Sequence, residues 1–188
     1  SVDQFLERNQ DYVKIGIRAM SVFLSAYEQE SLSRYQPKGW YRWRFNKIFV
    51  HGASASGHTL DMTNVQIVTF NYDRIAEFYL EAYLRNSCAS QMPTVNFQAP
   101  IEHVYGKLNT PFHWDEKAKM FACDVTASQD ALAAYRSASK HIRIATTRSD
   151  ENAGQNYVNA RTVIAECSRL VFLGFGFNLQ NLKRIGVP

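Results

Sequence analysis

The sequence contains few cysteines and no long apolar run. Its three cysteines, Cys88, Cys123 and Cys167, are odd in number and lack metal-ligand spacing, and no signal peptide precedes them. We therefore expect reduced thiols in a cytoplasmic protein. The five histidines are also scattered without metal spacing, so we predict no metal site. No stretch approaches the roughly 18 apolar residues that a membrane span needs, which predicts no membrane partner.

An excess of charge of one sign is also lacking. Lys and Arg number 21 against 17 Asp and Glu, a net charge of +4 that suits an anionic ligand but is too small to require nucleic acid. Hydrophobic residues make up 46% of the chain and charged residues 20%, the balance of a folded domain with a core. The length fits one unit, so residues 1–188 are expected to form a single domain.

Three helices are predicted before the first clear strand. Ser1 and Gln4 have the spacing of a capping box, and a short helix is expected to start there. From Tyr12 to Tyr27 apolar residues recur at helical spacing and predict a long amphipathic helix, whose pattern is lost around residues 28–33. Residues 40–49 place aromatic side chains on one face, which predicts a third helix.

The small residues at 51–58 invite comparison with a phosphate-binding loop. Such a loop needs a helix N-terminus directly after its glycines, whereas here a short segment leads into a strand. We therefore interpret residues 51–58 as a flexible connection.

A short apolar run, Val65 to Phe70, ends abruptly in the polar residues Asn71 and Asp73. This pattern predicts a buried strand, and the helical spacing that begins at Ile75 predicts a helix directly after it. Later patterns predict, in order, a strand at 101–106, a surface excursion at 107–123, a helix at 127–140, a strand at 141–145, a helix at 157–167 with Cys167 on its apolar face, and a strand at 170–173. Strands that alternate with helices predict an α/β domain with a mainly parallel sheet.

Polar or glycine-rich residues follow three of the predicted strands, at 69–73, 103–106 and 174–178. If the strands are parallel, all three ends lie at one edge of the sheet, where ligands bind in such folds. Asn, Asp and His side chains there would supply directional hydrogen bonds, and glycines would let the backbone approach a ligand. The alternative is that Asn71 and Asp73 serve only as turn and cap residues.

In their order and spacing, the three segments resemble the sirtuin-like (silent information regulator-like) family, in particular the divergent branch found in bacterial NAD-consuming defence proteins. Thr69-Phe70-Asn71-Tyr72-Asp73 resembles the family's Thr-Asn-Tyr-Asp element, and His103-Val104-Tyr105-Gly106 resembles its His-x-His-Gly. Gly174-Phe175-Gly176-Phe177-Asn178 resembles its late Gly-Phe-Ser loop. The resemblance implies a Rossmann-like three-layer domain, in which helices flank a mainly parallel sheet, and NAD as cofactor.

The resemblance also implies roles for single residues. As catalytic residues it implies Asn71, which would orient water or a ribose hydroxyl, Asp73 as a supporting acid, and His103 and Tyr105 from the His motif. As cofactor-binding residues it implies Thr69, Phe70, Gly106, Gly174, Phe175, Gly176 and Asn178.

The sequence departs from the family at three places, one of which is Gly176, which stands where the late loop has a hydroxyl residue. Tyr105 stands where the motif has its general-base His, and Tyr, with a pKa near 10, is a poor base at neutral pH. The family's first strand and glycine-rich loop are not found before Val65. The resemblance therefore implies a nucleotide-binding module and leaves open whether it hydrolyses NAD and whether it forms a homo-oligomer.

A second reading comes from the basic and aromatic residues between 34 and 47. Arginines and lysines alternate there with tyrosine and tryptophan, a mixture that could stack on and neutralise single-stranded nucleic acid in a non-catalytic module. The same residues also fit an amphipathic helix with a basic solvent face, which we prefer. Nucleic acid is therefore not the partner we expect.

Overall fold

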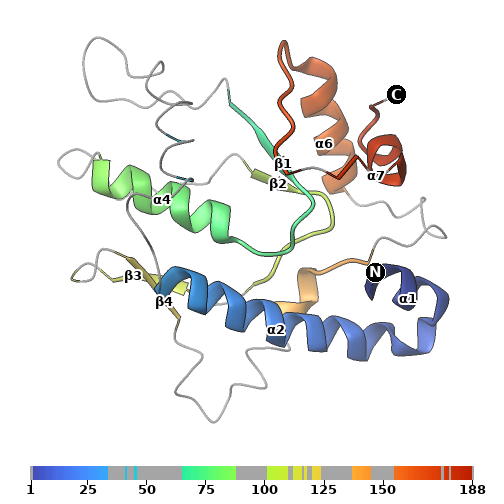
Figure 1. Ribbon diagram of the computed structural model, residues 1–188, viewed down its shortest axis with the longest axis horizontal. Helices are drawn as coiled ribbons and strands as arrows, with labels where there is room; N and C mark the ends of the chain where they lie inside the picture. Colours follow the sequence, from blue (N-terminus) through green and yellow to red (C-terminus); the bar gives the residue numbers. More distant parts are fainter. Residues whose placement is uncertain are drawn as a thin grey trace.

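The chain combines helices with a small parallel pair of strands, which confirms the broad α/β class (Figure 1). The computed structural model describes residues 2–33, 41, 45, 65–87, 101–109, 112–115, 117, 120–123, 137–144, 155–174, 176–177 and 179–187. The helices are α1 (Val2–Arg8), α2 (Val13–Ser33), α4 (Ile75–Ser87), α6 (Gln155–Glu166) and α7 (Leu179–Arg184), with 3₁₀ turns at Gln10–Tyr12 and Ser139–His141. The strands are β1 (Ile67–Thr69), β2 (Ile101–His103), β3 (Phe112–Asp115) and β4 (Met120–Cys123).

The described strands form two separate pairs. β1 and β2 are parallel, with Ile67 opposite Ile101 and Thr69 opposite His103. β3 and β4 are antiparallel and form a hairpin. The prediction of a surface excursion at 107–123 is therefore wrong for this part of the segment. Asp115 shapes the turn after β3, because its carboxylate accepts a hydrogen bond from the Lys117 N–H at 2.8 Å. The described residues thus contain a parallel pair but no larger parallel sheet.

Two predicted strands are not strands. Residues 139–141 form a 3₁₀ turn, and in the extended backbone after it the Arg143 N–H donates to the Tyr105 carbonyl at 2.9 Å. Residues 170–173 are irregular, and Leu170, Val171 and Leu173 are exposed. An apolar run becomes a strand only when a neighbour supplies a ladder of hydrogen bonds, and among the residues that the structure describes neither run is paired in this way.

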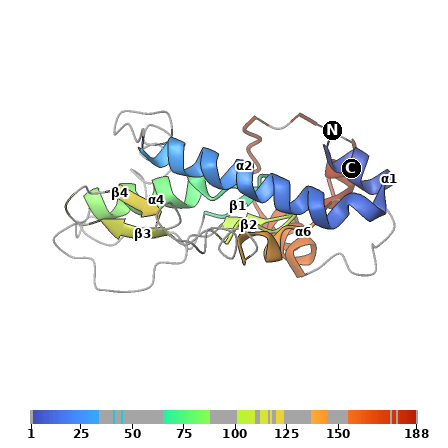
Figure 2. The same ribbon diagram turned by 90° about the horizontal axis from the view of Figure 1, so that it is seen from below.

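The core is built around α4. Phe78 and Ala82 on this helix pack against Leu32 at the end of α2, and the two helices lie side by side (Figure 2). Leu80 and Leu84 pack against Phe45, and Tyr41 stacks on Phe45 with 5.9 Å between ring centroids. Tyr41 and Phe45 are both helical, as predicted for residues 40–49; the rest of that segment, like the predicted loop at 51–58, lies outside the described residues.

Helix α2 forms as predicted and continues to Ser33, but its strongly apolar face points away from the core. Ile15, Phe23 and Tyr27 are exposed, whereas Ser21 and Glu28 on the opposite face are fully buried. Cys167 is also exposed, so its predicted place in the core is wrong: it lies just beyond the end of α6, where the helix no longer covers it. No helix in the described part of the chain combines the length and the apolar character needed to cross a membrane.

Candidate functional site

The parallel pairing brings two of the three predicted segments together. The Val104 N–H donates to the Thr69 carbonyl at 2.9 Å, which continues the β1–β2 pairing beyond the last strand residues. The Leu108 N–H donates to the Tyr72 carbonyl at 2.9 Å. Residues 69–73 and 103–106 therefore lie next to each other at the carboxyl ends of both strands, as the sequence predicts for parallel strands.

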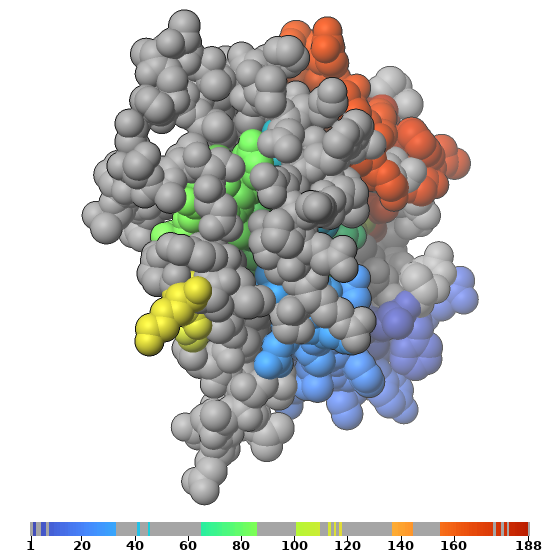
Figure 3. Space-filling model, turned by 60° about the vertical axis from the view of Figure 1, so that its left-hand side comes forward, coloured from blue at the N-terminus to red at the C-terminus, as the bar shows by residue number. Residues whose placement is uncertain are grey.

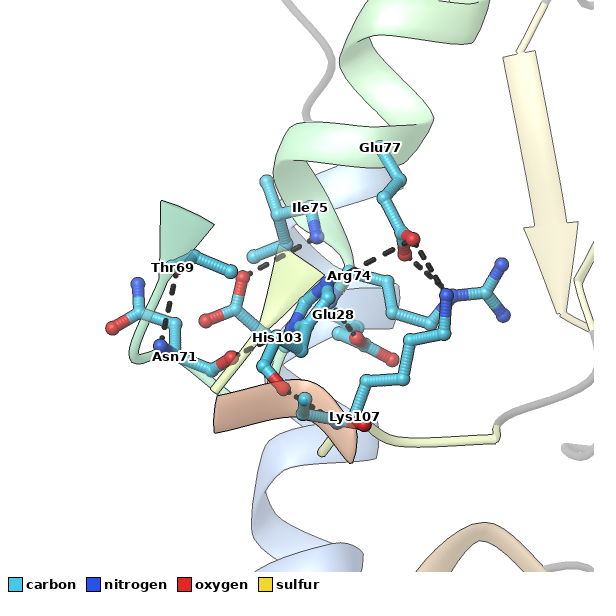
Figure 4. A network of polar contacts seen from close by, with 10 residues as sticks. Glu28, Thr69, Asn71, Arg74, Ile75, Glu77, His103 and Lys107 are labelled. Carbon is cyan, nitrogen blue, oxygen red and sulfur yellow. Dashed lines mark hydrogen bonds and ion pairs between the residues drawn. The ribbon is translucent and has the colours of Figure 1, made fainter. Parts of the chain in front are cut away.

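His103 connects these two segments through its side chain (Figure 4). Its Nδ1 lies 2.8 Å from the Asn71 carbonyl oxygen. Because a carbonyl can only accept, Nδ1 carries a hydrogen. The ring is 4% exposed, and its Nε2 faces the Glu77 carboxylate with 3.7 Å between Nε2 and Oε1. His103 thus holds the Asn71 backbone in place from the neighbouring strand.

Asn71 presents its side chain at the surface. The residue is exposed, and in Figure 4 its amide group points away from His103 and Glu77. Its backbone is held at both ends, since its N–H donates to the Thr69 hydroxyl at 3.1 Å and its carbonyl accepts from His103. A side-chain amide that can both donate and accept is therefore exposed just beyond the carboxyl end of β1.

Three carboxylates surround the N-terminus of α4, where free backbone N–H groups and the helix dipole favour negative charge. The Asp73 carboxylate accepts from the Ile75 N–H at 3.3 Å, so Asp73 caps α4. Burial raises the pKa of Asp73, although the Ile75 N–H and His103 act in the opposite direction. Glu28 reaches the same helix end from α2, and its carboxylate accepts from the Arg74 N–H at 2.5 Å.

Glu77, in the first turn of α4, is the centre of the charged groups. Arg74 donates to its Oε2 at 2.7 Å, and Lys107 donates to its Oε1 at 2.8 Å. Burial alone would raise the pKa of Glu77, but the contact with His103, the charge of Arg74 and the bond from Lys107 outweigh it and lower the pKa to about 2. Glu77 is therefore ionised at neutral pH and holds β2, α4 and the Lys107 segment together.

Tyr105 lies in an aromatic cluster and not at the surface. Its ring contacts those of Phe70, Tyr72 and Tyr157, with centroids 5.6, 6.2 and 5.9 Å away. Its hydroxyl donates to the Asn181 side chain at 2.5 Å and accepts from Arg184 at 2.8 Å. The Tyr105 hydroxyl is thus held by two polar partners from α7.

Gly106 allows a close approach of two backbones. Its φ is +76°, and a Cβ built on it would lie 1.8 Å from the His141 carbonyl oxygen. Only glycine fits such a position, because other residues would meet both the left-handed conformation and a backbone clash. Gly106 therefore has a structural role here, whether or not it also contacts a ligand.

The third predicted segment is described only in part. Gly174, Gly176 and Phe177 are exposed and irregular, and Gly174 and Phe177 have positive φ values of 61° and 48°. Phe175 and Asn178 lie outside the described residues. The helix that follows, α7, contacts Tyr105 through Asn181 and Arg184, so α7 lies beside the His103–Gly106 segment.

Sequence analysis missed the charged residues that support the two segments: Glu28, Arg74, Glu77 and Lys107. The spacing of Arg74 and Glu77, three apart on a predicted helix, indicates an ion pair and could have been noticed. Nothing in the sequence links Glu28 to Arg74, since they are 46 residues apart.

The basic and aromatic segment at 34–47 is described at Tyr41 and Phe45 alone, and their packing on α4 accounts for both as core residues. Burial, followed by the charge of Asp73, raises the pKa of Tyr41 to about 12.

Among the residues that the structure places, no group of three or more His, Cys, Asp or Glu side chains could hold a metal ion. Comparisons with protein-family models, curated proteins and solved structures found no match for this chain.

Proposed function

We propose that this chain is a sirtuin-like module that binds NAD or a related nucleotide at the carboxyl ends of β1 and β2. One observation carries the proposal: the parallel pair places the Asn71 segment beside the His103–Gly106 segment, with the Asn71 amide exposed at that edge. In parallel α/β folds this edge is where nucleotides bind. The proposal includes the Rossmann-like three-layer arrangement that the resemblance implies.

Ligand binding is tested by titration calorimetry with NAD and with ADP-ribose. We expect both to bind wild type, and Asn71→Ala to weaken binding about tenfold, the effect of losing one hydrogen bond of about 1.4 kcal/mol. Gln66→Ala is the matched control, because Gln66 is an exposed amide just before β1, at the opposite end of the strand. If wild type binds neither ligand, or if Gln66→Ala weakens binding as much as Asn71→Ala, the proposed site is wrong.

Catalysis requires more than binding. Hydrolysis of the glycosidic bond of NAD passes through a cationic ribose, and a base near neutrality contributes about 10²–10⁴-fold. Asn71 could orient water, but the Tyr105 hydroxyl is bonded to Asn181 and Arg184. We therefore expect little or no nicotinamide release by the wild type, and none by Asn71→Ala. Rapid release that survives Asn71→Ala would contradict both the assignment of Asn71 and a sirtuin-like mechanism.

A further inference from the structure

Helices α1 and α2 together expose an unusually apolar surface. We define the α1–α2 stripe as Phe5, Tyr12, Ile15, Val22, Phe23 and Tyr27, whose exposed fractions range from 38% for Val22 to 76% for Phe23. Phe5 on α1 and Tyr12 in the 3₁₀ turn before α2 are in ring contact, with 6.1 Å between ring centroids, which joins α1 to the start of α2 in one surface. In Figure 3 the blue side chains of α1 and α2 lie together at the surface, and in Figure 2 α2 runs along the outer side of the molecule.

The stripe is not the part of α2 that stabilises the fold. Ile17 and Leu24 pack towards Leu108 and Ile142, and Leu32 packs on α4. The remaining residues of this inner face are polar, with Ser21 donating to the Ile17 carbonyl at 2.8 Å and Glu28 bound to the Arg74 N–H. Helix α2 therefore has a complete inner face and a second, more apolar face in solvent.

The area of the stripe is large enough for a specific interface. Its four aromatic side chains are each more than half exposed, and together they present roughly 500 Å² of surface. The largest apolar patch of an ordinary monomer is about 300–600 Å², and each partner of a standard interface buries about 800 Å². With Ile15 and Val22 added, the stripe exceeds the range expected for a monomer and approaches that of one partner in a dimer.

The spacing along the stripe identifies the kind of partner. Tyr12, Ile15, Ala19, Val22 and Ala26 alternate by three and four residues, the seam spacing of paired helices. Two antiparallel copies of α2 that cross at Ala19 would place Ile15 opposite Phe23 of the other copy and Tyr12 opposite Ala26. Tyr12 then meets a small side chain, and the antiparallel helix dipoles attract each other.

We propose that the α1–α2 stripe is a self-association surface, on which a second copy of this chain docks its own α2 in antiparallel orientation about a two-fold axis near Ala19. Such isologous pairing is the commonest way in which identical chains associate. The proposal is independent of nucleotide binding, because the stripe shares no residue with the Asn71 segment.

Analytical ultracentrifugation across the micromolar range tests the proposal. We expect wild type to sediment as a dimer, and Phe23→Glu and Ile15→Lys each to raise the dissociation constant at least about tenfold, because each removes a large apolar side chain from both sides of the interface. Both positions are well exposed, at 76% and 65%, so the fold should tolerate the changes. Val158→Glu is the control, since Val158 is an exposed valine on α6 outside the stripe.

The double variant Ile15→Lys with Phe23→Glu tests the register. In the proposed pairing each lysine meets a glutamate of the other copy, so the double variant should recover at least part of the association that either single variant loses. A wild type that stays monomeric, a dimer that both single variants leave intact, or one that Val158→Glu also breaks would overturn the proposal. Failure of the double variant to recover association would overturn the register about Ala19.

Discussion

Gly106→Ala offers the sharpest test of how the candidate site is held together. The left-handed backbone at φ +76° costs an alanine about 1–2 kcal/mol. Its Cβ would in addition lie 1.8 Å from the His141 carbonyl oxygen, and because that atom belongs to the backbone, the two segments must move apart. Overpacking of this kind costs about 1–3 kcal/mol. We therefore expect Gly106→Ala to lower the free energy of unfolding by about 2–5 kcal/mol, a large part of the 5–15 kcal/mol typical of a domain.

Gly186→Ala provides a matched control. Gly186 has nearly the same φ, +77°, but the nearest atom to its added Cβ is the Arg161 Cγ at 3.7 Å, an ordinary contact. Gly186→Ala should therefore lower the free energy of unfolding only by the cost of placing an alanine in the left-handed backbone conformation, about 1–2 kcal/mol. Urea unfolding followed by circular dichroism measures both variants, with unchanged m-values as the sign that the two transitions are comparable. If Gly106→Ala costs no more than Gly186→Ala, the close approach between the Gly106 and His141 segments is wrong.

Two further predictions concern side chains of the site. As the pH falls from 4.5 to about 2, protonation of Glu77 should lower the free energy of unfolding by up to about 3 kcal/mol, because the pKa of Glu77 is lower in the folded state. Urea unfolding across this pH range should show a flatter dependence of the unfolding free energy on pH for Glu77→Gln than for wild type. Equal slopes for the two proteins would contradict the low pKa of Glu77. Tyr105→Phe should lower the free energy of unfolding by about 1–3 kcal/mol, because Arg184 and Asn181 lose their hydrogen-bond partner. Tyr12→Phe at the surface is the control and should change the free energy of unfolding little. Equal effects of the two variants would contradict the buried hydrogen bonds of the Tyr105 hydroxyl.

Local patterns in the sequence were sufficient for several elements. The apolar run before Asn71 predicted β1, and the spacing after Asp73 predicted α4, because a strand or a helix of this kind depends on residues that are neighbours in the chain. The cap by Asp73 was open to prediction for the same reason, since its carboxylate bonds a backbone N–H only two residues away. The adjacency of the 69–73 and 103–106 segments followed from one further assumption, parallel pairing, which the structure bears out.

The apolar run at 170–173 shows where such patterns fail. It has the composition of a buried strand, yet its residues are exposed and irregular. Composition indicates that a segment can pair, whereas pairing itself requires a neighbouring strand with free backbone groups at the right place. The hairpin β3–β4 is the opposite case, because its two strands pair with each other although the sequence at 107–123 shows no clear period.

The sequence by itself determined that α2 is a helix with one strongly apolar face and that Asn71 and Asp73 follow β1. Only the tertiary structure decided which face of α2 meets the core. Periodicity measures how apolar a face is, but the inner face could accept Glu28 because the N-terminus of α4, 46 residues further along the chain, supplies a backbone N–H to its carboxylate. The same holds for His103 and Glu77: their roles come from partners that are distant in sequence, and folding alone brings those partners within hydrogen-bonding or ion-pair distance.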